Sequence, residues 1–159
     1  MLILGVVLGS LTTAFVQGSN AELRYNNRVQ AQLDATLALA RLRRDAHCAS
    51  DITPTGAAAS ITMTQPSGCP GGGGSIQWCT VGSGTRYGLY RTTGITCDAT
   101  AKRYADYLTA ASVFDYAAPV SGVSLGTLHL DMTVNLLPAK SQQGYRLIDD
   151  VVLRNTLRG

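Results

Sequence analysis

The first 46 residues constrain the fold of this chain most, because they contain no proline and pass from an apolar run into an amphipathic pattern. Residues 1–16, MLILGVVLGSLTTAFV, carry no charge, and the first charged side chain is Glu22. From there to residue 46 glycine is also absent, and apolar residues recur at helical spacing, namely Val29, Leu33, Leu37 and Ala40. The sequence therefore predicts one helix of more than forty residues, roughly 65 Å long at 1.5 Å per residue.

The two halves of this predicted helix require different surroundings. A membrane-spanning helix needs about 17 to 25 apolar residues, so the apolar run is slightly short for a span and long for the core of a cleavable signal. No basic residue precedes it, and residues 17–20 match a signal cleavage site poorly. We expect residues 1–20 to form a hydrophobic, membrane-embedded segment, and residues 21–47 to form an amphipathic half-helix. Leu39 and Leu42 widen its apolar stripe, while the predicted solvated face carries Arg24, Arg28, Asp34, Arg41, Arg43, Arg44 and Asp45.

From residue 51 onward the pattern changes to turn clusters and short alternating runs, which are typical of an antiparallel sheet. The predicted strands are 60–65, 75–81, 87–93, 129–137 and 145–153, within a sheet region of residues 58–157. Strand 129–137 is the clearest, because apolar and polar residues alternate along it and predict one buried face. A short second helix is predicted over residues 101–112. The fold class is thus α+β, with the amphipathic half-helix covering one antiparallel sheet in an extracytoplasmic domain of residues 21–159.

Four cysteines, an even number, predict two structural disulfides in an oxidising compartment: Cys48, Cys69, Cys79 and Cys97. No CxxC pair is present, so we expect no metal site. In a meander of three strands, Cys69 and Cys97 would lie at one edge of the sheet, which leaves Cys48 to pair with Cys79; the other two connectivities stay open. A charged fraction of 14%, well below the usual level of about 25%, also favours an extracellular surface.

Three segments carry a resemblance to a known family: LGVVLGSLTTAFVQ, RVQAQLDATLALARLRRD and the C-terminal YRLIDDVVLRN. The first is similar to the hydrophobic helix of the type IV pilin and pseudopilin superfamily, the second to the amphipathic half-helix of its minor members, and the third to the last strand and Arg-Asn ending of those minor members. The resemblance implies a structural subunit, a minor pilin or pseudopilin of a type IV pilus or a type II secretion-like filament, whose partners are other such subunits and the membrane. It implies that the following residues form the filament and membrane helix: Leu2, Ile3, Leu4, Val6, Val7, Leu8, Leu11, Phe15 and Val16.

The family's processing signal is a basic leader, a glycine, a methylated phenylalanine and a nearby glutamate, and this sequence has none of the four. Met1 already lies inside the apolar run. We therefore expect the true start of the protein to lie upstream of Met1.

Two alternatives remain: a simple membrane anchor for a surface domain, and a DNA-uptake pseudopilin. For the second, scattered arginines near tyrosines could form a nucleic-acid surface; these are Arg86, Arg91, Arg103, Arg146, Arg154 and Arg158, with Tyr87, Tyr90, Tyr104 and Tyr107. More often such residues form a solvated face. A net charge of +3 by itself identifies no partner.

Catalysis is not expected, and neither is a cofactor. The two histidines, His47 and His129, belong to no nucleophile or zinc-protease motif. Neighbouring residues on a strand face opposite sides of the sheet, so we expect one carboxylate of Asp149 and Asp150 to face solvent and the other to pair with an arginine. The glycine run 71–74 lacks the lysine and the helix of a phosphate-binding loop, so a flexible hairpin loop is predicted there.

Overall fold

The computed structural model describes residues 2–70, 73–94, 96–137 and 144–155, with only the backbone for residues 2–11. The chain divides into two units, Met1–Gln30 and Ala31–Gly159. The first unit is helical throughout its described length, and the second is an α+β domain in which a helix packs on a curled antiparallel sheet. This layout confirms the predicted fold class at that level.

Helix α1 runs from Leu2 to Cys48, as the absence of proline predicts. It ends where the amide of Ala49 bonds the carbonyls of Asp45 and Ala46, after which the amide of Ser50 bonds the carbonyl of Thr64 in the sheet. The helix therefore leads directly into the first strand.

Nine described strands follow in chain order: β1 (Asp51–Thr53), β2 (Gly56–Ala58), β3 (Ser60–Gln65), β4 (Gly74–Ser83), β5 (Arg86–Thr92), β6 (Lys102–Leu108), β7 (Phe114–Ala117), β8 (Thr127–Val134) and β9 (Tyr145–Val152). All the pairings between them are antiparallel. The order is β1-β3-β4-β5-β6-β8-β7-β2, and β9 pairs with β8.

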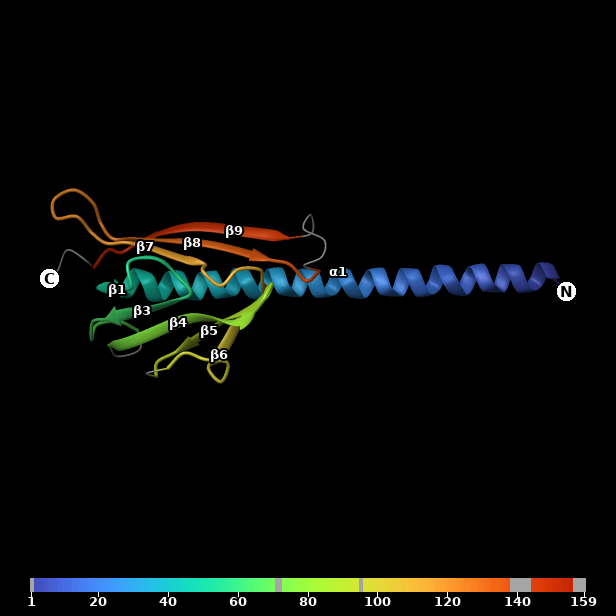
Figure 1. Ribbon diagram of the computed structural model, residues 1–159, viewed down its shortest axis with the longest axis horizontal. Helices are drawn as coiled ribbons and strands as arrows, with labels where there is room; N and C mark the ends of the chain where they lie inside the picture. Colours follow the sequence, from blue (N-terminus) through green and yellow to red (C-terminus); the bar gives the residue numbers. More distant parts are fainter. Residues whose placement is uncertain (1, 71–72, 95, 138–143, 156–159) are drawn as a thin grey trace. The chain divides into compact units, whose positions relative to one another are not determined.

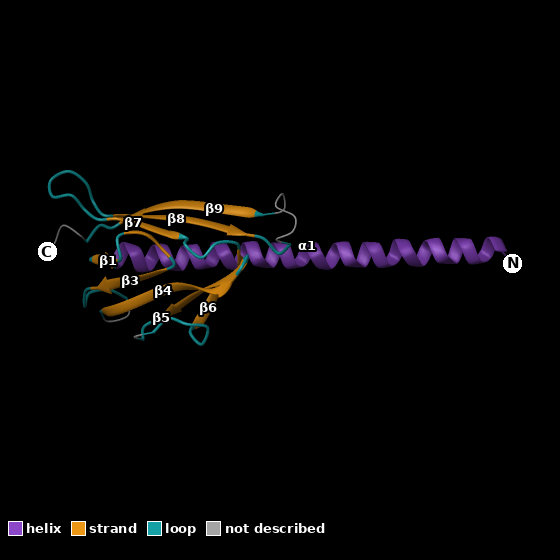
Figure 2. Cartoon of the chain, viewed as in Figure 1, coloured by secondary structure: helices purple, strands orange, loops and turns teal. Residues whose placement is uncertain are grey.

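The sheet curls around the second half of α1 in two groups of strands (Figures 1 and 2). One group is β1-β3-β4-β5-β6 and the other is β2-β7-β8-β9; they meet where Leu108 of β6 pairs with Val134 of β8. The chain itself makes a second link, because only Ala59 separates β2 from β3; its carbonyl accepts a hydrogen bond from the amide of Thr80 in β4 at 2.8 Å. Both groups can therefore bury their inner faces on the same helix.

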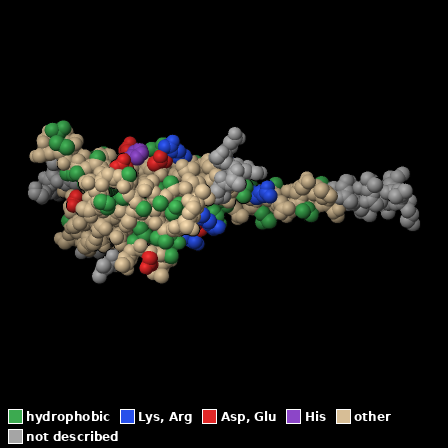
Figure 3. Space-filling model, in the orientation of Figure 1, with side chains coloured by type: hydrophobic (Ala, Val, Ile, Leu, Met, Phe, Trp, Pro, Cys, Tyr) green, Lys and Arg blue, Asp and Glu red, His purple; other side chains and the backbone are tan. Residues whose placement is uncertain are grey.

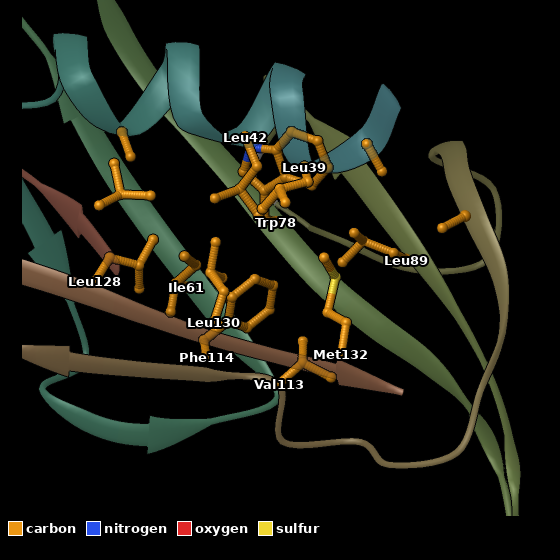
Figure 4. Close-up of a cluster of buried hydrophobic side chains, with 14 of the residues drawn as sticks. Leu39, Leu42, Ile61, Trp78, Leu89, Val113, Phe114, Leu128, Leu130 and Met132 are labelled. Carbon is orange, nitrogen blue, oxygen red and sulfur yellow. The ribbon is translucent and has the colours of Figure 1, made fainter. Parts of the chain in front are cut away.

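One hydrophobic core lies between the helix and the two strand groups. Figure 4 shows Leu39 and Leu42 of α1 directed toward Trp78 of β4, with Leu128 and Leu130 of β8 in the same cluster. Burial alternates strictly along β8, as predicted for its apolar and polar residues. The inner faces of the sheet and one face of the helix thus supply the burial that stabilises the domain.

Five of the nine strands confirm the predicted strands, with ends that differ by up to three residues. The predicted helix over 101–112 is wrong, since strand β6 occupies residues 102–108 and pairs with β5. Leu89 lies opposite Ala105 there, and a bulge with Tyr107 at φ 63° interrupts the alternation that would have revealed a strand. Strands β1, β2 and β7 were not predicted, because three or four residues carry too little periodicity.

The predicted buried stripe of the helix is confirmed only for Leu39 and Leu42. Ala40, Leu33 and Leu37 are exposed, and Val29 is only half-buried. The face that packs on the sheet consists mainly of alanine, with Leu39 and Leu42 as its large residues: Ala31, Ala35, Ala38, Leu39, Leu42 and Ala46. Small side chains allow the strands to approach the helix closely, so the covered face is the one richest in alanine.

Candidate functional site: the uncovered face of helix α1

An apolar stripe on α1 remains outside the core of the domain. Leu33 and Leu37 keep 53% and 67% of their surface exposed, whereas Ala35 and Leu42 are fully buried. At 100° per residue, Leu33 and Leu37 share one side of the helix, and Ala35 and Leu42 lie on the opposite side. We call Leu33, Leu37 and Ala40 the uncovered face. It presents aliphatic side chains to solvent within the folded domain, as surfaces that bind a partner do.

The N-terminal unit has the same character in its described part. Phe15 is 83% exposed and Val16 is 59% exposed, and Leu23 and Tyr25 are exposed as well. Of the predicted filament residues, Leu2, Ile3, Leu4, Val6, Val7, Leu8 and Leu11 lie in α1, but their side chains fall outside the described set. Among the residues searched, no helix is long and apolar enough to cross a membrane.

The far end of α1 is held in the sheet by Asp45, which is buried with 4% of its surface exposed. Its carboxylate accepts hydrogen bonds from Arg91 Nε at 2.7 Å and from Trp78 Nε1 at 3.1 Å, and Arg41 Nε lies 3.5 Å away. Gln65 Nε2 donates to the Asp45 backbone carbonyl at 3.1 Å. The prediction that Asp45 lies on the solvated face was wrong; the indole N–H and the guanidinium satisfy its buried charge.

A second set of contacts connects the last turns of α1 with β9 and the residues after it. Arg43 Nη2 donates to Asp149 Oδ1 at 2.7 Å, and Arg43 Nε also donates to this carboxylate. The hydrogen bond from Arg43 lowers the pKa of Asp149 and raises that of Arg43. Asn155 Nδ2 donates to the Cys48 carbonyl at 3.1 Å, so the residue after β9 covers the helix end. Asp150 is more exposed and lies 2.6 Å from His129, so the expectation of one arginine-paired and one solvated aspartate is confirmed.

Both predicted disulfides form, but the pairing is Cys48 with Cys69 and Cys79 with Cys97. The expected pairs, Cys69 with Cys97 and Cys48 with Cys79, are wrong. Trp78 faces the core, so its neighbour Cys79 faces outward on β4, opposite Tyr90, and cannot reach the helix end. Cys69 lies just beyond β3. The end of β3 is hydrogen-bonded to the residues that follow α1, so Cys69 lies close to Cys48 at the end of the helix. One disulfide fastens the helix to the sheet, and the other fastens the loop after β5.

Ion pairing largely neutralises the arginines considered for nucleic-acid binding. Arg91 pairs with buried Asp45, and Arg146 pairs with Asp131 and lowers the pKa of that carboxyl. Arg86 and Arg103 share one carboxylate, Asp106, and the guanidinium of Arg86 lies 4.3 Å from the Tyr107 ring centre. Arg154 is exposed just after β9, and Arg158 lies outside the described residues. These arginines therefore serve contacts within the domain, and the described ones form no stripe of uncompensated charge.

Both histidines contact strand β9. Nδ1 of His47 lies 3.2 Å from the Val152 carbonyl oxygen, and the neighbouring Cys48 has no thiolate because it is disulfide-bonded. His129 lies on the exposed face of β8 beside Asp150. No cluster of histidine, cysteine and carboxylate side chains suited to a metal ion occurs among the residues that the structure describes. Of the glycine run 71–74, the described Gly73 and Gly74 have positive φ, as tight turns require.

No family model, no curated protein and no solved structure matches this chain. What the chain does is therefore inferred from its own residues and their geometry. Sequence reasoning missed two features that bear on function, the buried Asp45 and the apolar loop between β7 and β8. The sequence signals for the loop are Pro119, Gly122 and Gly126, together with the absence of charge between residues 116 and 128.

Proposed function

We propose that this chain is a structural subunit of a pilin-like filament, of the minor pilin or pseudopilin kind, held in a membrane by its N-terminal segment before assembly. The observation that carries the proposal is that α1 continues from residue 2 to Cys48, whereas its own domain begins only at Ala31. Every described side chain from residue 12 to 28 is exposed. A helix of this length with uncovered apolar residues requires lipid or neighbouring helices around it.

The distribution of exposed apolar residues favours a filament over a plain membrane anchor. An anchor needs an apolar surface only in residues 1–16, where the run without charge lies. The uncovered face extends the apolar surface to Leu33, Leu37 and Ala40, beyond the charges at Glu22, Arg24 and Arg28. A bilayer that holds the apolar run does not reach this face, but a neighbouring subunit can cover it.

The disulfides support a location outside the cytoplasm. Reducing compartments disfavour such bonds, and Cys48–Cys69 joins the end of α1 to the sheet. The Asp45 contacts hold the same end. Because the end of the helix is fixed to the sheet, the position of the helix determines the position of the sheet. A subunit that packs on its neighbours through its helix requires such a fixed connection. We accordingly propose a structural role without catalysis or cofactor.

Reconstitution of the full chain into neutral lipid vesicles tests the proposal. Copies labelled with a donor or an acceptor dye at Thr85→Cys, on the exposed turn between β4 and β5, are mixed and floated with the vesicles. We expect flotation together with energy transfer that excess unlabelled chain abolishes. Leu37→Asp should weaken the transfer because it places a charge on the uncovered face, whereas Ser83→Asp, an exposed control, should not.

Two results would contradict the proposal, and each excludes a different role for the chain. Flotation without energy transfer identifies a monomeric membrane anchor. A chain that stays out of the vesicles and shows no energy transfer refutes both the anchor and the filament subunit.

A further inference from the structure

The loop between β7 and β8, residues 118–126, has a defined turn at its tip. The amide of Val120 donates to the carbonyl of Ser124, and the amide of Ser124 donates back to the carbonyl of Val120, both at 3.0 Å. The amide of Val123 also donates to the Val120 carbonyl, and Gly122 has φ +71°. These bonds fix the shape of a short loop that extends beyond the strands of its domain (Figure 1).

This turn holds apolar side chains in solvent. Val120 is 54% exposed and Val123 is 82% exposed, and hydrophobic atoms gather on the projecting loop in Figure 3. Beside them is an open hollow of about 260 Å³, lined by Val120, Gly122, Val123, Ser124 and Leu125. No charged residue occurs from residue 116 to 128. An ordered, uncharged apolar tip on a soluble domain indicates a contact surface.

The size and the chemistry of the hollow indicate what it can accept. It is smaller than most sites for small molecules, which run from about 300 to 1,000 Å³. It is larger than the apolar cavity of about 150 Å³ that accepts a benzene ring. An aliphatic side chain from a protein suits this space. The loop has no cation for a phosphate, so neither nucleic acid nor an anionic lipid headgroup is favoured.

The same domain also exposes aliphatic side chains of the kind that the hollow accepts. Leu33 and Leu37 project from the uncovered face of α1, and they precede the end of the helix by several turns. A hollow and a ridge at different places on one domain can meet in a heterologous contact, in which the hollow of one copy receives the ridge of the next. Such a contact repeats from copy to copy and builds an open assembly unless the rotation closes a ring.

We propose that the β7–β8 loop of one copy binds the Leu33–Leu37 ridge on α1 of the next copy. The inference rests on the proposed filament function and adds to it the pair of surfaces that meet. In this arrangement the loop determines which subunit binds next to it. The apolar N-terminal segment of the helix contributes association that is less specific.

Disulfide trapping on the full chain in vesicles tests the pairing. Val123→Cys on one preparation and Leu37→Cys on a second, distinguishable by mass, are mixed under mild oxidation. We expect a mixed dimer whose cross-linked peptide joins residues 123 and 37. Thr85→Cys replaces Val123→Cys as the matched exposed control and should give about tenfold less mixed dimer.

Two further results separate this inference from the proposed function. Val123→Asp should weaken association of the otherwise native chain about tenfold, since the loop would bury a charge beside leucine. If the chain associates normally, but Val123→Asp has no effect and residue 123 links to itself or to residues outside α1, the loop contact is overturned and the filament function stands. If the unmodified chain does not associate at all, both fail.

Discussion

Replacement of Asp45 by asparagine should destabilise the domain more than any other change of one carboxylate to an amide. Asp45 is the buried partner of Arg91, whose side chain is only 14% exposed, and it also accepts the Trp78 indole hydrogen bond. Asp45→Asn keeps the shape but leaves the guanidinium without its counter-charge. Removal of one member of a buried ion pair costs about 3–5 kcal/mol, and we expect about 3 kcal/mol here because Arg91 retains some contact with water.

Urea denaturation of the oxidised protein measures this loss. A cost of about 3 kcal/mol corresponds to a fall in Tm of roughly 10 °C for a domain of this size. Asp115→Asn, at an exposed position on β7, is the matched control and should change the free energy of unfolding by less than about 0.5 kcal/mol.

A double variant tests whether the lost partner is the cause. Arg91→Met in the Asp45→Asn background removes the stranded charge, so the double variant should be more stable than Asp45→Asn alone, because uncharged side chains tolerate this site better than one unpaired ion. A cost below about 1 kcal/mol for Asp45→Asn, or a double variant whose losses simply add, would refute the assignment of Asp45 as the anchor of the helix.

Three further predictions concern the same domain. Peptide mapping should recover Cys48–Cys69 and Cys79–Cys97, and Cys48→Ser with Cys69→Ser should cost about 3 kcal/mol by urea denaturation; recovery of any other pair contradicts the fold. Because the pKa of Asp149 is lowered in the folded state by the Arg43 hydrogen bond, the stability it adds is present above the unfolded pKa of about 3.9 and is lost as the pH falls through the folded value. Arg43→Gln should therefore cost about 0.5–1 kcal/mol at pH 7, a figure discounted because Arg43 is half-exposed, and this cost should shrink as acid protonates Asp149; a stability difference that does not change with pH would contradict this. Ala38→Leu should overpack the buried helix face and cost about 1–3 kcal/mol, whereas exposed Ala40→Leu should be nearly neutral in thermal unfolding; equal effects would mean that the covered face is misassigned.

Local pattern was sufficient for the parts of the fold that depend on it. The absence of proline predicted the long helix, and the alternation between Leu128 and Val134 predicted β8 and its buried face. Residues 101–112, AKRYADYLTAAS, have the composition of a helix, but pairing of β6 with β5 outweighs that preference. Strand β6 forms because it pairs with another strand, and a short stretch of sequence around residues 101–112 does not include that strand.

The buried helix face and the disulfides depended on tertiary packing. Leucine spacing selected Leu33 and Leu37 as buried, but the sheet approaches the alanine side, where Ala35 and Ala38 are fully buried. The cysteine pairing required the orientation of β4, which Trp78 determines by occupying the core. The candidate site was therefore predicted correctly as helix, but the side of that helix that carries Leu33 and Leu37 was predicted to be covered and is exposed.

Sedimentation velocity of the full chain in a mild detergent, over a wide range of protein concentration, tests the central claim most directly. We predict that the mass rises above the 16.7 kDa monomer as concentration increases, and that a Leu33→Asp and Leu37→Asp double variant, folded by circular dichroism, remains monomeric. A native chain that remains monomeric at every concentration, or a double variant that associates as strongly as the native chain, would contradict assembly through the uncovered face of α1.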